Sequence, residues 1–96
     1  MLTEKSSKEL IFMLQREDKK LKEVFKSIKL TGKEKAKEIF ELAKSYYKDY
    51  VYFKEKKDYV KAFELQNYVW GLLDALAILK AISVPKKLQK YFKTDF

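Results

Sequence analysis

The sequence predicts an all-α fold: a small antiparallel three-helix bundle, made of a helical hairpin and an N-terminal helix, with a short C-terminal helix or tail. First, apolar residues recur at helical spacing on both sides of the charged interruption from Lys54 to Asp58. Second, the chain is 47% apolar and 16% aromatic, which is too apolar for disorder, while 38% charged residues exclude a membrane-embedded chain. Third, 96 residues allow one modest core, which predicts a single domain over residues 1–96.

The N-terminal helix is predicted to begin at Ser6, which forms a capping box with Glu9, or slightly earlier at Thr3. Its apolar residues keep helical spacing to about Lys29, where we expect the helix to end. The run Gln15–Lys20 contains no apolar residue, so the pattern leaves open a bend or an interruption there.

The second helix is predicted to begin near Gly32, because Thr31 and Glu34 form a second capping box. Gly32 also disfavours a continuous helix across this junction. The apolar stripe of this helix consists of Ala36, Ile39, Phe40, Ala43, Tyr46, Tyr47, Tyr50 and Phe53. Lysines and glutamates occupy the remaining arc, so the helix is amphipathic.

Asp58 is predicted to cap the third helix, because its carboxylate can accept hydrogen bonds from amides of the first turn. From Tyr59 to Ile82, apolar residues occupy most of the helix circumference. Residues 58–82 carry two lysines and three carboxylates, whereas the whole chain has a net charge of +8. We therefore expect this helix to be central and covered by its neighbours. Pro85 ends it, and a short final helix over about Pro85–Lys93 would dock by Leu88, Tyr91 and Phe92.

The composition narrows the classes of function. The chain has no cysteine and no histidine, which removes thiolate chemistry, disulfides, the commonest metal ligand and the usual acid–base catalyst. We therefore predict no enzyme, no catalytic residue, no cofactor and no metal. No apolar run is longer than the five residues of Leu10–Leu14, which is too short to span a membrane, and the acidic start is not typical of a secretory signal. A cytoplasmic protein is expected, and the surface rich in lysine and glutamate is typical of thermophiles.

Parts of the sequence resemble the short archaeal proteins grouped as domain of unknown function 357. The resemblance lies in four segments: Tyr46–Asp49, Tyr52–Phe53, Asp58–Phe63 and Asn67–Ala75. The family pattern has glycine before the Asp-Tyr pair, where this chain has Lys57, and a His-Gly-Trp-Leu-Asp run, where it has Trp-Gly-Leu-Leu-Asp. A role of the family histidine cannot be shared by this chain. The resemblance implies a small archaeal helical bundle without an assigned activity.

Three polar or small residues interrupt the most apolar helix on one face: Asn67, Gly71 and Asp74. Because a helical glycine is unfavourable, we expect a close helix crossing at Gly71, with Asn67 and Asp74 on either side of it. Their favoured role is structural, as hydrogen-bonding groups that fix helix register. The alternative is a small polar pocket.

The aromatic residues are the first candidates for an interaction surface: Tyr46, Tyr47, Tyr50, Tyr52, Tyr68 and Trp70. Helical spacing predicts that most of them pack in the core. Residues one or two positions apart on a helix point at least about 100° apart, however, so at least one of Tyr46 and Tyr47, and one of Tyr50 and Tyr52, should lie off the core-facing stripe. Such tyrosines could stack on bases or contact a partner.

Six lysines are candidates for phosphate contacts and could merge into one basic patch at one end of the bundle: Lys33, Lys35, Lys37, Lys86, Lys87 and Lys90. Interleaved glutamates favour an ordinary solvated surface instead. The sequence therefore favours a non-enzymatic protein-interaction or scaffold module, with an unknown protein partner or self-association and with no membrane contact. The alternative is a nucleic-acid-binding protein that uses the lysines and exposed tyrosines.

Overall fold

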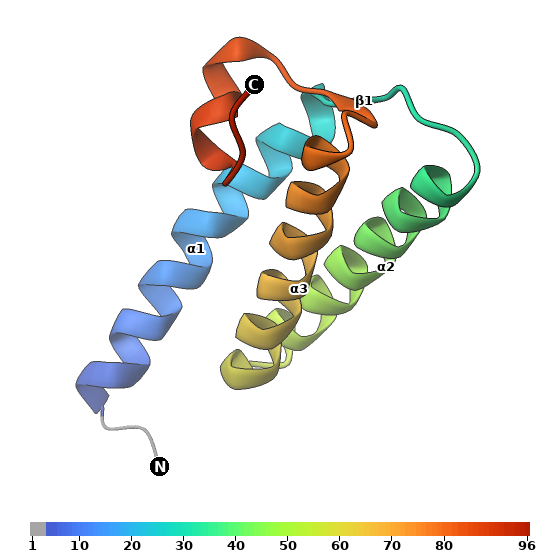
Figure 1. Ribbon diagram of the computed structural model, residues 1–96. Helices are drawn as coiled ribbons and strands as arrows, with labels where there is room; N and C mark the ends of the chain where they lie inside the picture. The colour runs from blue at the N-terminus through green and yellow to red at the C-terminus, as the bar shows by residue number, and fades with distance from the viewer. Residues whose placement is uncertain (1–3) are drawn as a thin grey trace.

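The computed structural model describes residues 4–96, with side chains from Ser7 onward. Three long helices run up, down and up: α1 (Glu4–Ser27), α2 (Lys35–Glu55) and α3 (Tyr59–Ile78) (Figure 1). Helices α2 and α3 form the predicted antiparallel hairpin, and α1 packs against both of its helices. The predicted all-α bundle, with the third helix in contact with both others, is confirmed.

Helix α1 is continuous through Gln15–Lys20, so the apolar gap neither breaks nor ends it. The helix already includes Glu4, so Ser6 lies inside it and does not start it; Thr3, the other predicted start, lies outside the described residues. At its other end α1 stops at Ser27, two residues before the predicted Lys29. The reason is a short strand that the sequence did not predict.

Two short strands, β1 (Lys29–Leu30) and β2 (Ile82–Ser83), form an antiparallel pair across the end of the bundle. Leu30 pairs with Ile82, and the amides of Thr31 and Gly32 both donate to the carbonyl of Ala81. This pair joins the chain after α1 to the chain after α3. It therefore ends both helices earlier than their apolar patterns predict.

Helix α2 begins at Lys35, so the predicted start near Gly32 and its capping box are wrong. The hydroxyl of Thr31 donates to the carbonyl of Lys80 at 3.3 Å, and Glu34 has φ 54°, outside the helical region. Gly32 is needed for a close approach: a Cβ atom there would lie 2.8 Å from the Cβ of Ala81. Thr31 and Gly32, which the sequence predicts to start the helix, instead contact Lys80 and Ala81 just before β2.

Asp58 caps α3 as predicted, because its Oδ1 accepts from the amide of Lys61 at 3.2 Å. The helix ends at Ile78, before the predicted Ile82, where Lys80 adopts φ 56° and the amide of Ala81 donates to the carbonyl of Leu76 at 2.9 Å. After β2 the chain forms a 3-10 helix, η1 (Lys86–Tyr91), directly after Pro85. The short C-terminal helix is thus present, with 3-10 geometry.

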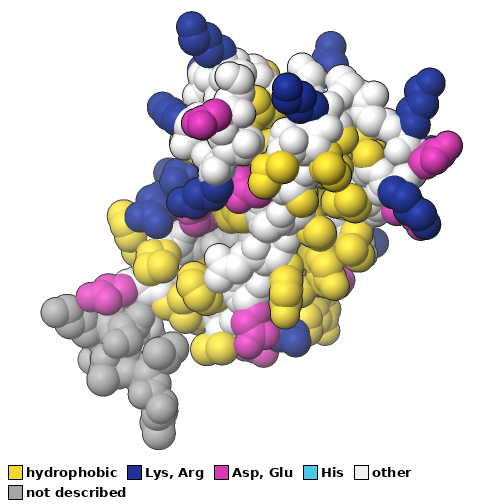
Figure 2. Space-filling model, viewed as in Figure 1, with side chains coloured by type: hydrophobic (Ala, Val, Ile, Leu, Met, Phe, Trp, Pro, Cys, Tyr) yellow, Lys and Arg dark blue, Asp and Glu magenta, His cyan; other side chains and the backbone are white. Residues whose placement is uncertain are grey.

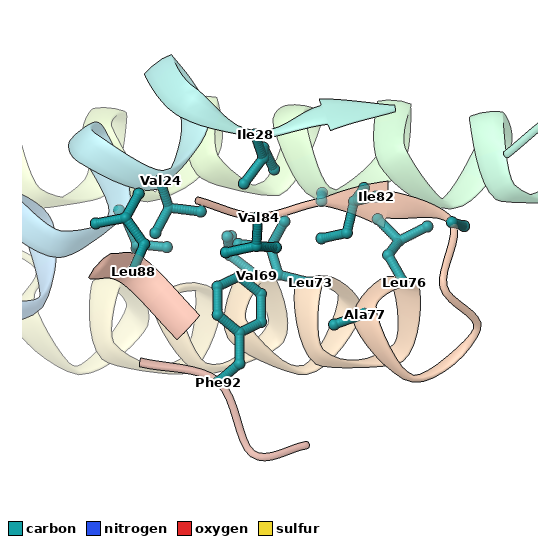
Figure 3. Close-up of a cluster of buried hydrophobic side chains, with 13 residues drawn as sticks. Val24, Ile28, Val69, Leu73, Leu76, Ala77, Ile82, Val84, Leu88 and Phe92 are labelled. Carbon is teal, nitrogen blue, oxygen red and sulfur yellow. The ribbon is translucent and has the colours of Figure 1, made fainter. Parts of the chain in front are cut away.

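The main core lies where α1, α3, the strands and the C-terminal segment meet (Figure 3). Val24 of α1 and Leu73 of α3 are completely buried, and Leu88 and Phe92 dock onto them from η1 and the residue after it. Leu88 and Phe92 are buried and Tyr91 is half-buried, as predicted. Burying a side chain of this size stabilises the fold by roughly 1.5–3 kcal/mol. A second cluster between the lower halves of the helices consists of Leu14, Tyr50, Ala62 and Leu65.

Candidate interaction surface

Helix α3 is apolar around most of its circumference, but its neighbours cover only part of it. The side toward α1 and α2 is buried, whereas the opposite side is open to solvent. We call this side the open α3 face; it consists of Val60, Tyr68, Gly71, Ala75, Ile78 and Leu79. Tyr68, Ile78 and Leu79 are 60%, 62% and 62% exposed. The expectation that neighbouring helices cover α3 is wrong on this side.

The open α3 face continues onto the neighbouring edge of α2. Leu42 is exposed there, and Tyr46 is half-buried with its ring stacked on that of Tyr68 at a centroid distance of 5.6 Å and an interplanar angle of 26°. Figure 2 shows the resulting apolar surface as a band of yellow side chains over α3 and toward α2. Patches of this kind on soluble proteins mark interaction sites.

Gly71 lies in the middle of the open α3 face. A Cβ atom added there would meet nothing within 4 Å. The helix crossing predicted at this position is therefore absent within the molecule, because neither α1 nor α2 covers this side of α3. The unfavourable helical glycine has no packing reason inside the described part of the chain.

The other two residues of the predicted polar site lie in a groove of about 290 Å³ between α1, α3 and η1. The groove is lined by Glu17, Lys20, Asn67, Trp70, Asp74, Lys90, Tyr91 and Lys93. Asp74 has a structural contact there, since its Oδ1 accepts from the backbone amide of Lys93 at 2.9 Å and holds the C-terminal segment on α3. Asn67 is exposed at the rim.

Trp70 lies between this groove and the core. Its ring packs edge-on against Phe92, with centroids 6.0 Å apart. Its Nε1 is buried and has no hydrogen-bond partner among the described residues. An unpaired buried donor costs about 1–3 kcal/mol. Because its ring packs against Phe92, Trp70 has a packing role, as the helical spacing predicts.

The remaining predicted aromatics divide between core and surface. Tyr50 is completely buried, whereas Tyr52 is 54% exposed, which confirms that one of this pair leaves the core-facing stripe. The ring of Tyr52 contacts Phe53 and the ammonium of Lys56, which directly follows α2, so it lies apart from the stacked pair on the open face. Tyr46 and Tyr47 are both half-buried, one toward α3 and one toward α1.

Sequence reasoning missed Asp18, a buried carboxylate on α1 that is only 5% exposed. It accepts from the hydroxyl of Tyr47 at 3.3 Å and from Lys54 Nζ at 3.3 Å, both on α2, and pairs with Lys22 at 3.1 Å. Burial alone would raise the pKa of Asp18, but hydrogen bonds and charge from Lys22 and Lys54 hold this pKa below its ordinary value. One signal was available: Asp18 lies at helical spacing between Leu14 and Leu21, on the buried stripe of α1.

The carbonyl of Leu14, one turn before Asp18, joins all three helices. It accepts from the hydroxyl of Tyr50 on α2 at 3.4 Å and from Nε2 of Gln66 on α3 at 3.2 Å. Gln66 is almost completely buried. Together with Asp18, these bonds fix the register of α1 against the hairpin, because a shift of α1 along its axis would leave these buried polar groups without partners.

The candidate phosphate-binding lysines fall into two groups. Lys33, Lys35 and Lys37 lie at the start of α2, and the other three lie in η1. Figure 1 places η1 and the start of α2 on opposite sides of α3, with the β1–β2 pair between them. Lys35 pairs with Glu38 at 3.0 Å, and Lys87 lies 3.9 Å from Glu23 of α1.

A further hollow, of about 490 Å³, is an open depression lined by Phe12, Gln15, Arg16, Asp18, Lys19 and Lys22. These lining residues all belong to α1, and most have exposed side chains, so the depression offers no convergent set of groups. Within residues 7–96, no three His, Cys, Asp or Glu side chains are placed to hold a metal ion. None of the described helices has the length and apolarity to cross a membrane.

The fold and its surface define the class: a small all-α bundle protein with an uncovered apolar helix face. The model of one family, of proteins of unknown function (DUF357), matches residues 11–82. This match covers most of the chain, so the chain belongs to that family, as its resemblance predicts. No curated protein and no solved structure matched it.

Proposed function

We propose that this protein is a non-enzymatic protein-interaction module, cytoplasmic and of archaeal origin, whose binding surface is the open α3 face with Leu42 and Tyr46 of α2. One observation carries the proposal: α3 is apolar around most of its circumference, and one side of it is exposed to solvent. Exposed apolar area of this kind is costly in water and marks a place where a partner binds.

Charge distribution supports this choice of surface. Helix α3 carries Lys61, Glu64 and Asp74 as its only charged residues, in a chain of net charge +8. Asp74 points to the groove beside α1, and Lys61 and Glu64 lie within 4.0 Å of each other near the start of the helix. The open face is therefore free of charge from Tyr68 to Leu79, as the cores of protein interfaces are.

The alternative, a nucleic-acid-binding protein, has less support. Its six lysines lie in two groups on either side of α3, and one lysine of each group lies within ion-pair distance of a carboxylate. Phosphate binding needs basic side chains that converge along one backbone. The experiment below also tests this alternative.

The test places a photoreactive side chain on the proposed surface. Tyr68→p-benzoylphenylalanine is compared with Tyr52→p-benzoylphenylalanine, which replaces a tyrosine of similar exposure away from the open face. Both are irradiated in lysate of the source organism, and a captured protein is then purified and titrated against wild type and Tyr68→Glu. The proposal predicts a defined protein adduct from position 68 and at least 10-fold weaker binding by Tyr68→Glu. Adducts to nucleic acid alone, or equal adducts from both positions, would contradict it.

A further inference from the structure

We propose that the partner on the open α3 face is a second copy of this chain, which packs with its own α3 antiparallel to the first and crosses it at Gly71. This inference rests on the proposed function, because it assigns an occupant to the same surface. Most symmetric dimers use one patch twice, so the patch must be complementary to itself. Three features of the open face meet this condition.

The first feature is Gly71. It is exposed at the middle of α3, and no atom within the described molecule needs the space that its missing side chain leaves. With a twofold axis between Gly71 and Leu72, the Gly71 positions of the two copies would lie only about 1.5 Å apart along the helix direction, next to the crossing point. Two helices approach each other most closely where neither carries a side chain, so a crossing here accounts for a residue that the single chain does not explain.

The second feature is the arrangement of large and small side chains around Gly71. When two α3 helices run antiparallel about an axis between Gly71 and Leu72, Tyr68 of each copy lies opposite Ala75 of the other copy. Tyr68 is 60% exposed and Ala75 is half-buried, so a large projecting ring faces a small residue twice. This is the size complementarity that packed helices need.

The third feature is charge. In the same arrangement Glu64 of one copy lies opposite Leu79 of the other, next to Lys80. Glu64 and Lys80 are both exposed, and Lys80 extends from the turn that ends α3. Two Glu64–Lys80 pairs would bracket the crossing at equal distances. The face is therefore complementary to itself in charge as well as in shape.

The area agrees with a dimer of moderate affinity. Leu42, Val60, Tyr68, Ile78 and Leu79 are each 45–62% exposed. Together they offer on the order of 400–500 Å² of apolar surface. A standard interface buries about 800 Å² per partner, a little over half of it apolar. The apolar part is thus present on this one face, and the rim of Lys61, Glu64 and Lys80 supplies polar area.

The test is sedimentation velocity of the purified protein from about 1 to about 500 μM, combined with charge reversal. Wild type is expected to dimerise with a Kd of about 1–100 μM. Glu64→Lys and Lys80→Glu alone should each weaken the dimer at least fivefold, and the double variant should restore it. Glu41→Lys is the matched control, because Glu41 is as exposed as Glu64, has an i+3 lysine partner and lies away from the open face. Its dimer should match wild type.

A monomer at every concentration would overturn this inference, as would single reversals without effect or a double variant that stays monomeric. Circular dichroism of each variant shows that the helices remain folded. The two proposals can fail separately. If the protein is a monomer and position 68 still captures another protein, only the self-association is excluded. If position 68 gives no specific adduct, either with a second copy or with another protein, both proposals are excluded.

Discussion

The rings of Tyr46 and Tyr68 stack across the α2–α3 hairpin with centroids 5.6 Å apart. Tyr68 is therefore exposed and yet held in place, since one face of its ring is fixed by a residue of the neighbouring helix. Such aromatic pairs contribute about 0.5–1.5 kcal/mol beyond area burial. An ordered exposed ring loses little side-chain entropy when a partner binds, which favours it as an interface anchor.

Loss of this anchor should affect association more than folding. Tyr68→Glu removes the stacked pair and should lower the free energy of unfolding by about 1 kcal/mol, while it weakens partner binding or dimerisation at least 10-fold. Urea unfolding and sedimentation measure the two effects. Tyr52→Glu, at a tyrosine of similar exposure, should leave association unchanged. Equal losses of association in both variants would exclude the open face as the specific surface.

Substitutions of Gly71 should have opposite effects on the stability of the chain and on dimerisation. Because a Cβ atom there meets nothing within 4 Å, Gly71→Ala should stabilise the isolated chain by about 1 kcal/mol through helix propensity. Thermal unfolding at a concentration well below the Kd of the dimer, where the monomer prevails, measures this change. Gly71→Leu should remain folded but should weaken the dimer, because two leucines would separate the crossing helices. Destabilisation by alanine would contradict the open geometry.

Asp18 should give the fold a defined acid sensitivity. Its pKa is held below the ordinary value, so its stabilising effect is fully present above about pH 4 and is lost as the pH falls through the lowered pKa. Asp18→Asn should cost about 2 kcal/mol at pH 7 and much less at pH 2–3. Urea unfolding at both pH values tests this. Asp49→Asn, at an exposed aspartate of α2, should change stability by less than about 0.5 kcal/mol.

Tyr47 should act at the alkaline end. Burial, together with the charge of Asp18 and the hydrogen bond to it, raises the pKa of Tyr47 to about 12. Its contribution is therefore intact below about pH 10 and is lost as the pH rises through the raised value. Wild type should lose up to about 1 kcal/mol more than Tyr47→Phe between pH 9 and pH 11. If Tyr47→Phe and wild type lose stability in parallel, Tyr47 is not buried against Asp18 as described.

The sign of the salt dependence separates the two classes of partner. Two copies of a chain with net charge +8 repel each other, so screening by salt should strengthen the dimer between about 50 and 500 mM. Nucleic-acid binding weakens over the same range, because phosphate contacts release counterions. Sedimentation and fluorescence anisotropy follow the two processes. A dimer that dissociates with rising salt would contradict an apolar interface.

The sequence predicts the helices well where local chemistry decides. Asp58 marks the start of α3 because a cap acts within one turn, and apolar spacing locates α2 and α3. The strands escape prediction because Leu30 and Ile82 pair across 52 residues through backbone bonds that leave no local pattern. The same contact explains why Thr31 and Gly32 resemble a helix cap without forming one.

The candidate surface is harder to predict for a different reason. An apolar residue such as Ile78 or Tyr68 reads as core from periodicity, and only the packing shows that no neighbour covers it. Asp18 is the opposite case: it is buried, although it lies in a polar run that predicts solvent exposure. Gly71 predicts a helix crossing, and only the structure shows that no other helix of the same chain packs against it.

The most direct test of the open α3 face as an interaction surface is a dilution series of ¹⁵N-labelled protein followed by two-dimensional NMR. The account predicts that backbone signals of Tyr68, Gly71 and Ala75 shift with concentration, together with Leu42 at the edge of α2, while those of Lys19 and Tyr52 stay constant. Concentration-dependent shifts confined to the lysines of η1 and the start of α2, or no shifts on α3, would contradict it.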